Sequence, residues 1–109
     1  MKIFCKNKDM LDSAVMVWEQ LDVQGAYDDK HTLTIKRLPP KHHLKEYIEW
    51  PQITIDDGID YEICVKMDEE RYTTLAHEMV HLKQLIERGE TCEKEAYFLE
   101  KSLTMTPQK

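Results

Sequence analysis

The sequence lacks the features that mark several classes of protein. It has no run of basic residues, no Cys-x-x-Cys pair, and no apolar stretch near the ~20 residues of a transmembrane helix. Its formal net charge is −6, whereas binding to nucleic-acid phosphates requires a basic face. We therefore expect neither a nucleic acid nor a membrane among the partners of this chain.

Cysteines are few, with Cys5, Cys64 and Cys92 at scattered positions. Small secreted domains use even numbers of cysteines for disulfides, and thiolate zinc sites use closely spaced pairs. Residues 1–6 contain no apolar stretch of signal-peptide length. The sequence therefore predicts a cytoplasmic protein without a disulfide framework.

The length and composition are those of one folded domain. The chain has 109 residues, of which 41% are hydrophobic and 33% are charged, so it can form a modest core and is not expected to be disordered. We expect a single domain over residues 1–109, in which residues 104–109 form a flexible tail.

The pattern of apolar residues predicts an α+β fold. Short or alternating apolar runs predict strands at residues 2–5, 31–38, 52–56 and 61–67. Helical spacing predicts helices at residues 10–22, 70–88 and 91–103. Asp56-Asp57-Gly58 indicates a turn, so the last two strands are expected to form a hairpin. The order predicts an N-terminal helix, a small mostly antiparallel sheet and two C-terminal helices.

The ends of the predicted helices carry recognisable residues. We expect Asp9 to cap the first helix, Gly89 to end the second and Thr91 to cap the third. The second helix also has an apolar stripe, which is expected to face the core. This stripe consists of Leu75, Met79, Leu82 and Ile86.

The segment His77-Glu78-Met79-Val80-His81 lies on the predicted second helix. His77 and His81 are four residues apart, so both imidazoles project from one face within reach of one metal ion. A zinc ion with three protein ligands and an open position lowers the pKa of a bound water to about 7. Glu78 is placed to take the proton from that water. The segment therefore predicts a zinc site with Glu78 as general base.

The third zinc ligand is not part of this segment. The extended motif with a third histidine would need a glycine at position 84 and a histidine at position 87, where the chain has Gln84 and Glu87. No histidine follows His81, so a carboxylate from the last helix is the simplest choice. The candidates are Glu90, Glu93, Glu95 and Glu100.

The histidine segment and the following Glu93-Lys94-Glu95-Ala96-Tyr97 together resemble the gluzincin metallopeptidases. The closest likeness is to the minimal soluble minigluzincins and to short phage-type relatives. In that family a second helix brings a glutamate ligand, followed three residues later by a small residue. The resemblance implies a zincin-like fold in which Glu93 completes the zinc site with His77 and His81, and Ala96 lets the two helices approach.

Two further positions in this region bear on the third ligand and on the orientation of the histidines. Glu95 is the alternative ligand, because it lies about 200° around the helix from Glu93 and both cannot face one ion. The family usually has an aspartate four residues after the ligand glutamate, where it orients a histidine. In this chain that position is Tyr97.

The resemblance implies a zinc metallopeptidase that hydrolyses bonds in a peptide or protein substrate. The strand at residues 52–56 would then be the sheet edge that pairs with an extended substrate, although its residues alone fit a plain edge strand equally well. A second hypothesis is a catalytically silent zinc-binding module for interaction or regulation, and a third is a metal-free helical adaptor. We expect His42-His43 to lie in a solvated loop rather than to form a second metal site. The oligomeric state has no signal in the sequence.

Overall fold

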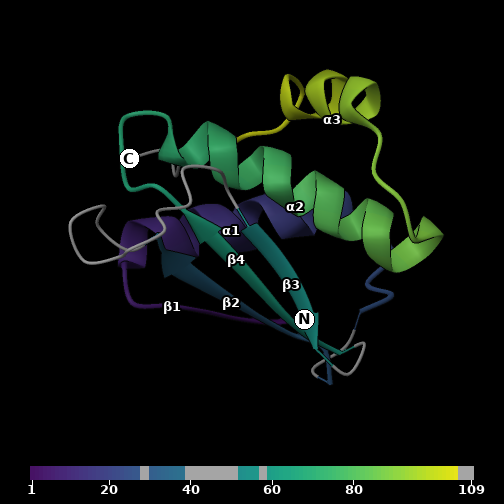
Figure 1. Cartoon of the computed structure of the whole chain (residues 1–109), viewed down its shortest axis with the longest axis horizontal. Helices are drawn as coiled ribbons and strands as arrows, with labels where there is room; N and C mark the ends of the chain where they lie inside the picture. The colour runs from purple at the N-terminus through teal and green to yellow at the C-terminus, as the bar shows by residue number, and fades with distance from the viewer. Residues whose placement is uncertain (28–29, 39–51, 57–58, 106–109) are drawn as a thin grey trace, which may run out of the picture.

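The computed structural model describes residues 1–27, 30–38, 52–56 and 59–105. Three helices and four strands lie in this part of the chain (Figure 1). In chain order they are β1 (Lys2–Cys5), α1 (Lys8–Leu21), β2 (Thr32–Arg37), β3 (Gln52–Asp56), β4 (Asp60–Val65), α2 (Arg71–Arg88) and α3 (Glu93–Glu100). The α+β class and the order of elements agree with the sequence prediction. The predicted solvated loop with His42-His43 lies outside the described residues.

The four strands form one mixed sheet in the order β1-β2-β4-β3. β2 pairs in parallel with both β1 and β4, and only β3 and β4 are antiparallel. The prediction of a mostly antiparallel sheet is therefore wrong. α1 connects β1 to β2, and such a helical crossover returns the chain to the same end of the sheet, which makes the two strands parallel. The hairpin prediction for β3 and β4 is confirmed.

Both long helices cover one face of the sheet, and α3 lies on the far side of α2 (Figure 1). The core between the sheet and the helices is apolar, and its buried members come from α1, β2, β4 and α2. On the strands they include Leu33, Ile35, Tyr61, Ile63 and Val65; on the helices they include Met10, Val17, Trp18, Leu75, Met79 and Leu82. The strand residues alternate inward as the period of two requires.

α2 matches its prediction closely. Leu75, Met79 and Leu82 are fully buried, so the predicted stripe faces the core, and Ile86 packs against the same cluster from its rim. Gly89 ends the helix at a φ of 74°, and its backbone N–H donates to the carbonyl of Leu85. A left-handed residue at this place is the usual role of glycine after a helix. Within the described chain, we find no helix long and apolar enough to cross a membrane.

The other two helix starts differ from the prediction. α1 is capped by Asn7, whose side chain accepts a hydrogen bond from the backbone N–H of Met10 at 3.0 Å, so Asp9 lies in the first turn instead. α3 begins at Glu93 after Cys92, one residue later than a Thr91 cap would allow, and ends at Glu100. Asparagine and aspartate are about equally good helix caps, so the choice of Asp9 over Asn7 had no basis in cap preference alone.

The predicted tail begins with two residues that are bound to α1. The side-chain amide of Gln20 accepts from the backbone N–H of Thr104 at 2.9 Å and donates to its carbonyl at 2.8 Å. The hydroxyl of Ser13 donates to the carbonyl of Met105. Thr104 and Met105 are therefore held on the body of the protein, and residues 106–109 lie outside the described residues.

We expect the packing of α2 to dominate the stability of the fold. Replacing the fully buried Leu75 by alanine should lower the free energy of unfolding by about 2–5 kcal/mol, because it removes apolar contacts and leaves a cavity. Val23 is 83% exposed, so Val23→Ala should change it by less than about 0.5 kcal/mol. Urea unfolding followed by circular dichroism measures both. Equal losses in the two variants would contradict this description of the core.

Candidate metal centre

The two histidines of α2 converge on one carboxylate from α3. His77 and His81 lie one helical turn apart, with ring centroids 4.5 Å apart and ring planes at 88°. The Nε2 atom of His77 is 3.3 Å from one carboxylate oxygen of Glu93, and the Nε2 atom of His81 is 2.6 Å from the other. The structure thus brings together the three residues that the sequence and the resemblance indicated as metal ligands.

These three side chains could hold one metal ion. Their donor atoms all lie within 4.8 Å of one another, and no other such group of His, Cys, Asp or Glu is found in the described part of the chain. In a tetrahedral zinc site with bonds of ~2.1 Å, neighbouring ligand atoms are ~3.4 Å apart. The distance of 3.3 Å between Nε2 of His77 and Glu93 already fits this geometry. The distance of 2.6 Å between Nε2 of His81 and Glu93 would have to increase by less than about 1 Å. The side chain of Glu93 is 63% exposed, so it has room for this movement.

The outer nitrogen of His77 is bound by a second carboxylate of α3. Its Nδ1 atom lies 2.6 Å from Oε2 of Glu100, and both side chains are only 14% exposed. An ionised carboxylate can only accept, so the Nδ1 atom carries the proton and the Nε2 atom can offer its lone pair to a metal ion. Glu100 was among the candidate ligands, but the structure places it behind His77.

Tyr97 stands at the position where the sequence resemblance to gluzincins would place an orienting aspartate, and its ring makes a different contact with His77. Its ring packs against the ring of His77, with centroids 4.7 Å apart, and the residue is 55% exposed. Glu100, seven residues after Glu93, supplies the carboxylate instead. Seven residues make nearly two turns of helix, so Glu93 and Glu100 share one face of α3 and reach opposite nitrogens of the same imidazole.

The outer nitrogen of His81 is bound by Gln84, which the sequence did not indicate as functional. The Nδ1 atom of His81 lies 2.9 Å from Oε1 of Gln84, and both residues are buried. Gln84 is one turn beyond His81 on the same helix face. Two features of the sequence could have identified Gln84: its spacing from His81, and the presence of a polar residue on the helix face that the last helix was expected to cover.

Glu95 points away from the histidines. Its carboxylate pairs with Arg88 and accepts a hydrogen bond of 3.3 Å from Nε2 of Gln84. The hydrogen bond from Arg88 is the main reason that the pKa of Glu95 lies below its ordinary value. Between the two alternative ligands, the structure therefore places Glu93 at the histidines. Ala96 is the buried residue of α3, which contacts α2, and it is fully buried.

Glu78 lies beside this group and is partly buried. Burial raises the pKa of its carboxyl above the ordinary value, whereas the nearby His81 and His77 act in the opposite direction and Glu93 raises it further. Glu78 directly follows the candidate ligand His77 on α2. A carboxyl in this place can exchange a proton with a group at the metal position.

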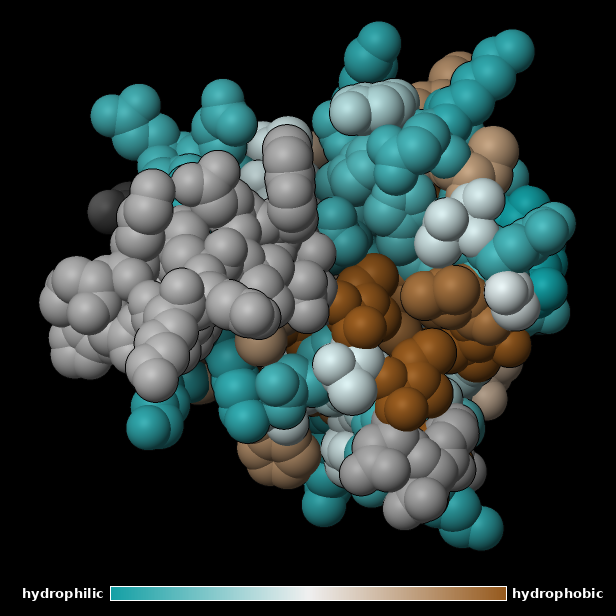
Figure 2. Space-filling model, in the orientation of Figure 1, coloured by the Kyte–Doolittle hydropathy of each residue, from teal (hydrophilic) through white to brown (hydrophobic). Residues whose placement is uncertain are grey.

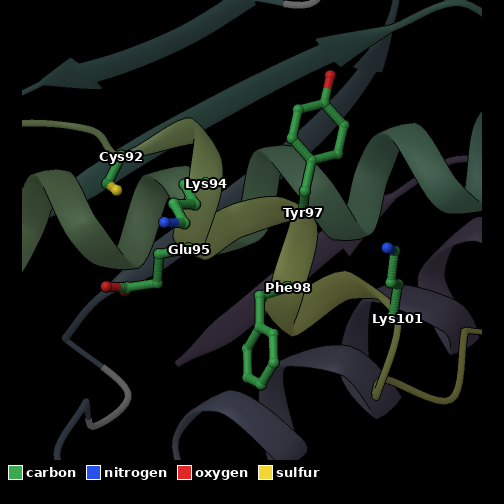
Figure 3. A pocket seen from close by; sticks show the side chains of 6 residues that line it. All are labelled: Cys92, Lys94, Glu95, Tyr97, Phe98 and Lys101. Carbon is green, nitrogen blue, oxygen red and sulfur yellow. The ribbon is translucent and has the colours of Figure 1, made fainter.

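An open depression lies along α3 next to the candidate metal-binding group (Figure 3). Figure 3 shows Tyr97 and Phe98 leaving the helix in opposite directions, with Cys92, Lys94 and Glu95 grouped at its start. Lys101 completes the lining, which includes none of the three candidate ligands. The thiol of Cys92 therefore faces this depression and not the histidines.

The surface beside β3 and α2 is apolar. Figure 2 shows brown side chains gathered where β3 runs next to α2 in Figure 1. Ile55 is opposite the buried Tyr61 in the β3–β4 ladder, yet it is 42% exposed. Paired residues share a face of the sheet, so Ile55 lies on the same face as the core residue Tyr61. The apolar surface is therefore continuous with the core next to α2.

Comparisons with protein-family models, with curated proteins and with solved structures found no match. The function must therefore be inferred from the residues of the site and their geometry.

Glu93→Ala should abolish tight binding of a divalent metal ion, because it removes the one carboxylate that faces both Nε2 atoms. Glu95→Ala is the matched control: it removes a neighbouring carboxylate that faces Arg88, and metal binding should persist. Isothermal titration of the metal-free protein with zinc measures both. Loss of binding in Glu95→Ala alone would show that Glu95 is the ligand.

Removal of the carboxylate behind His77 should weaken metal binding without abolishing it. We expect Glu100→Ala to lower the affinity for zinc by about 10- to 100-fold, as is typical for the partner of a metal-binding histidine. Glu90 is an exposed glutamate between α2 and α3, and Glu90→Ala should leave the affinity unchanged. A competition titration with a chromophoric chelator measures both constants. An unchanged affinity in Glu100→Ala would mean that the bond to His77 has no role in metal binding.

Proposed function

We propose that this protein is a zinc-dependent peptide hydrolase in which His77, His81 and Glu93 hold the metal and Glu78 is the general base. One observation carries the proposal: both Nε2 atoms face the Glu93 carboxylate, while both Nδ1 atoms are bound by acceptors behind them. This arrangement frees the nitrogens that face the site for a metal ion and fixes the orientation of each ring.

The composition of the site favours catalytic zinc over structural zinc. Structural sites are closed by four ligands, most of them thiolates, whereas catalytic sites use three protein ligands and keep one position open. Here two imidazoles and one carboxylate gather, and among the described residues no cysteine joins them. When bound in such a site, zinc supplies an acidified water and polarises the carbonyl of the substrate.

The residues of the chain supply the proton transfers. Glu78 takes the proton of the attacking water and can return it to the departing amine, so the peptide C–N bond breaks as the new C–O bond forms. Glu78 directly follows His77 on α2, and the two histidines beside it are held by Glu100 and Gln84. The partly buried setting favours a carboxyl that accepts a proton more readily than one in water.

The apolar surface beside the site supports an extended peptide or protein segment as the substrate. β3 is the end strand of the described sheet, and its outer edge has no partner among the described strands. Such an edge can pair with an extended chain through backbone hydrogen bonds, while side chains enter neighbouring apolar surface. Ile55 and the brown surface of Figure 2 provide that surface next to α2.

The arrangement of elements supports the gluzincin resemblance as part of the proposal. α2, which carries His77 and His81, packs against a mixed sheet whose end strand β3 is antiparallel. The next helix, α3, brings Glu93 to the histidines. We infer a minimal zincin-like domain, with α3 in the role of the glutamate helix.

Glu78→Gln should retain zinc and the fold but lower the rate of hydrolysis by about 10²- to 10⁴-fold, because the amide cannot accept the proton. Cleavage is measured by mass spectrometry on a mixture of unstructured peptides, with zinc content measured on the same samples. His77→Ala is the control that should lose zinc and hydrolysis together. Zinc binding without any cleavage by the unaltered protein would instead favour a catalytically silent binding module.

A further inference from the structure

Gln84 occupies an unusual position for an uncharged polar residue. It is 2% exposed, and all of its hydrogen-bonding groups are used between α2 and the start of α3. Oε1 accepts from the backbone N–H of Cys92 at 3.0 Å and lies 2.9 Å from Nδ1 of His81. Nε2 donates to the carbonyl of Cys92 at 3.1 Å and to Glu95 at 3.3 Å. The amide is therefore bound on both sides by groups of known polarity.

The backbone of Cys92 determines which way this amide points. A backbone N–H can only donate and a carbonyl can only accept, so the pair of bonds to Cys92 is possible in one orientation of the Gln84 amide. In that orientation Oε1 is the atom next to His81. An amide oxygen can only accept, so Nδ1 of His81 donates a proton to it, and Nε2 can then offer a lone pair to a metal ion held between it and Glu93.

We propose that Gln84 is a positioning residue that fixes the tautomer and the orientation of His81 through the peptide group of Cys92. The part that concerns metal affinity rests on the proposed function; the part that concerns the tautomer does not. Glu93 directly follows Cys92, so one side chain links the ligand His81 to the residue before the ligand Glu93. The two ligands are thereby held in register across the turn at Gly89.

Two substitutions separate this role from a purely structural one. Gln84→Met keeps the length of the side chain but removes every hydrogen bond. Gln84→Glu keeps an acceptor for His81 and for the Cys92 N–H, but it cannot donate to the Cys92 carbonyl. If the acceptor toward His81 determines zinc affinity, Gln84→Glu should retain the affinity and Gln84→Met should lose it. If Gln84 acts only by joining α2 to the start of α3, both variants should lose affinity equally.

Gln20 provides the matched control. It also binds one backbone residue through both ends of its amide, accepting from the N–H of Thr104 and donating to its carbonyl. It lies on α1 and outside the metal-binding group. Gln20→Met therefore loses an equivalent pair of backbone hydrogen bonds, and its effect measures the cost of such a loss in this fold without any effect on His81.

The first measurement is zinc affinity, by chelator competition on the full chain. We expect Gln84→Met to bind zinc about 10- to 100-fold more weakly, Gln84→Glu to stay within a few-fold of the unaltered protein, and Gln20→Met to be unchanged. Equal loss in Gln84→Met and Gln84→Glu, or no loss in either, would overturn the proposal. An unaltered protein that fails to bind zinc would contradict the proposed function, and the tautomer measurement would still decide on Gln84.

The second measurement is the tautomer of His81 in the metal-free Glu93→Ala variant, from the ¹⁵N chemical shifts of its ring at a pH where the ring is neutral. This variant is used because Glu93 accepts at Nε2 in the absence of a metal ion and would compete with Gln84 for the ring proton; its side chain is 63% exposed, so we expect the fold to be retained. We expect the proton on Nδ1. Adding Gln84→Met should shift the population toward the other tautomer, whereas adding Gln20→Met should not. A proton on Nε2 in the folded Glu93→Ala variant would overturn the proposal.

Discussion

The rest of the structure depends on the burial of one side of α2. Leu75, Met79 and Leu82 are fully enclosed by the sheet and α1, so the helix cannot rotate about its axis without exposing them. Successive residues of a helix are separated by ~100° about its axis, so this packing also fixes the direction of every other side chain on α2. His77, His81 and Gln84 consequently face α3. The core thus sets the directions of both imidazoles, although it touches neither Nε2 atom.

α3 is held in place mainly by its contacts with the two histidines and with Gln84, because few of its own side chains are buried. The helix has eight residues, and only Ala96 is buried. A helix this short is not stable by itself in water. It is held by Glu93 and Glu100 at the histidines and by the bonds of Gln84 to Cys92. A metal ion bound by residues of both helices would therefore also stabilise the position of α3, since binding to the folded state adds to its stability.

The sequence predicted the parts of this protein that follow from local spacing. The period of apolar residues located α2 and its buried stripe, and the interval between His77 and His81 located two members of the group that could hold a metal ion. The sheet was wrongly predicted to be mostly antiparallel, because hairpin signals are local whereas parallel pairing depends on a crossover that includes a helix. The cap at Asn7 was missed because Asn and Asp are both good caps and stood two residues apart.

The two residues behind the histidines illustrate a different limit. Glu100 and Gln84 act through contacts that exist only once α3 has turned back over α2, and no interval in the sequence gives the angle between two helices. Some signal was nevertheless present. Glu93 and Glu100 are spaced for one face of a helix, and Gln84 continues the face of His77 and His81. Spacing therefore identified residues that could share a site, and the turn at Gly89 decided which atoms meet.

The use of a carboxylate behind one histidine and an amide behind the other has an electrostatic reason. Glu78, Glu93 and Glu100 already place three carboxylates around the histidines. A fourth at position 84 would still accept from His81, but it would be buried and would face Glu95 and the Cys92 carbonyl, so it would lower the stability of the fold. The neutral amide accepts from His81 without adding charge, and its N–H groups satisfy these two acceptors. Among the described buried side chains, only Trp18 Nε1 on α1 lacks a hydrogen-bond partner, so every buried polar atom of this network is paired.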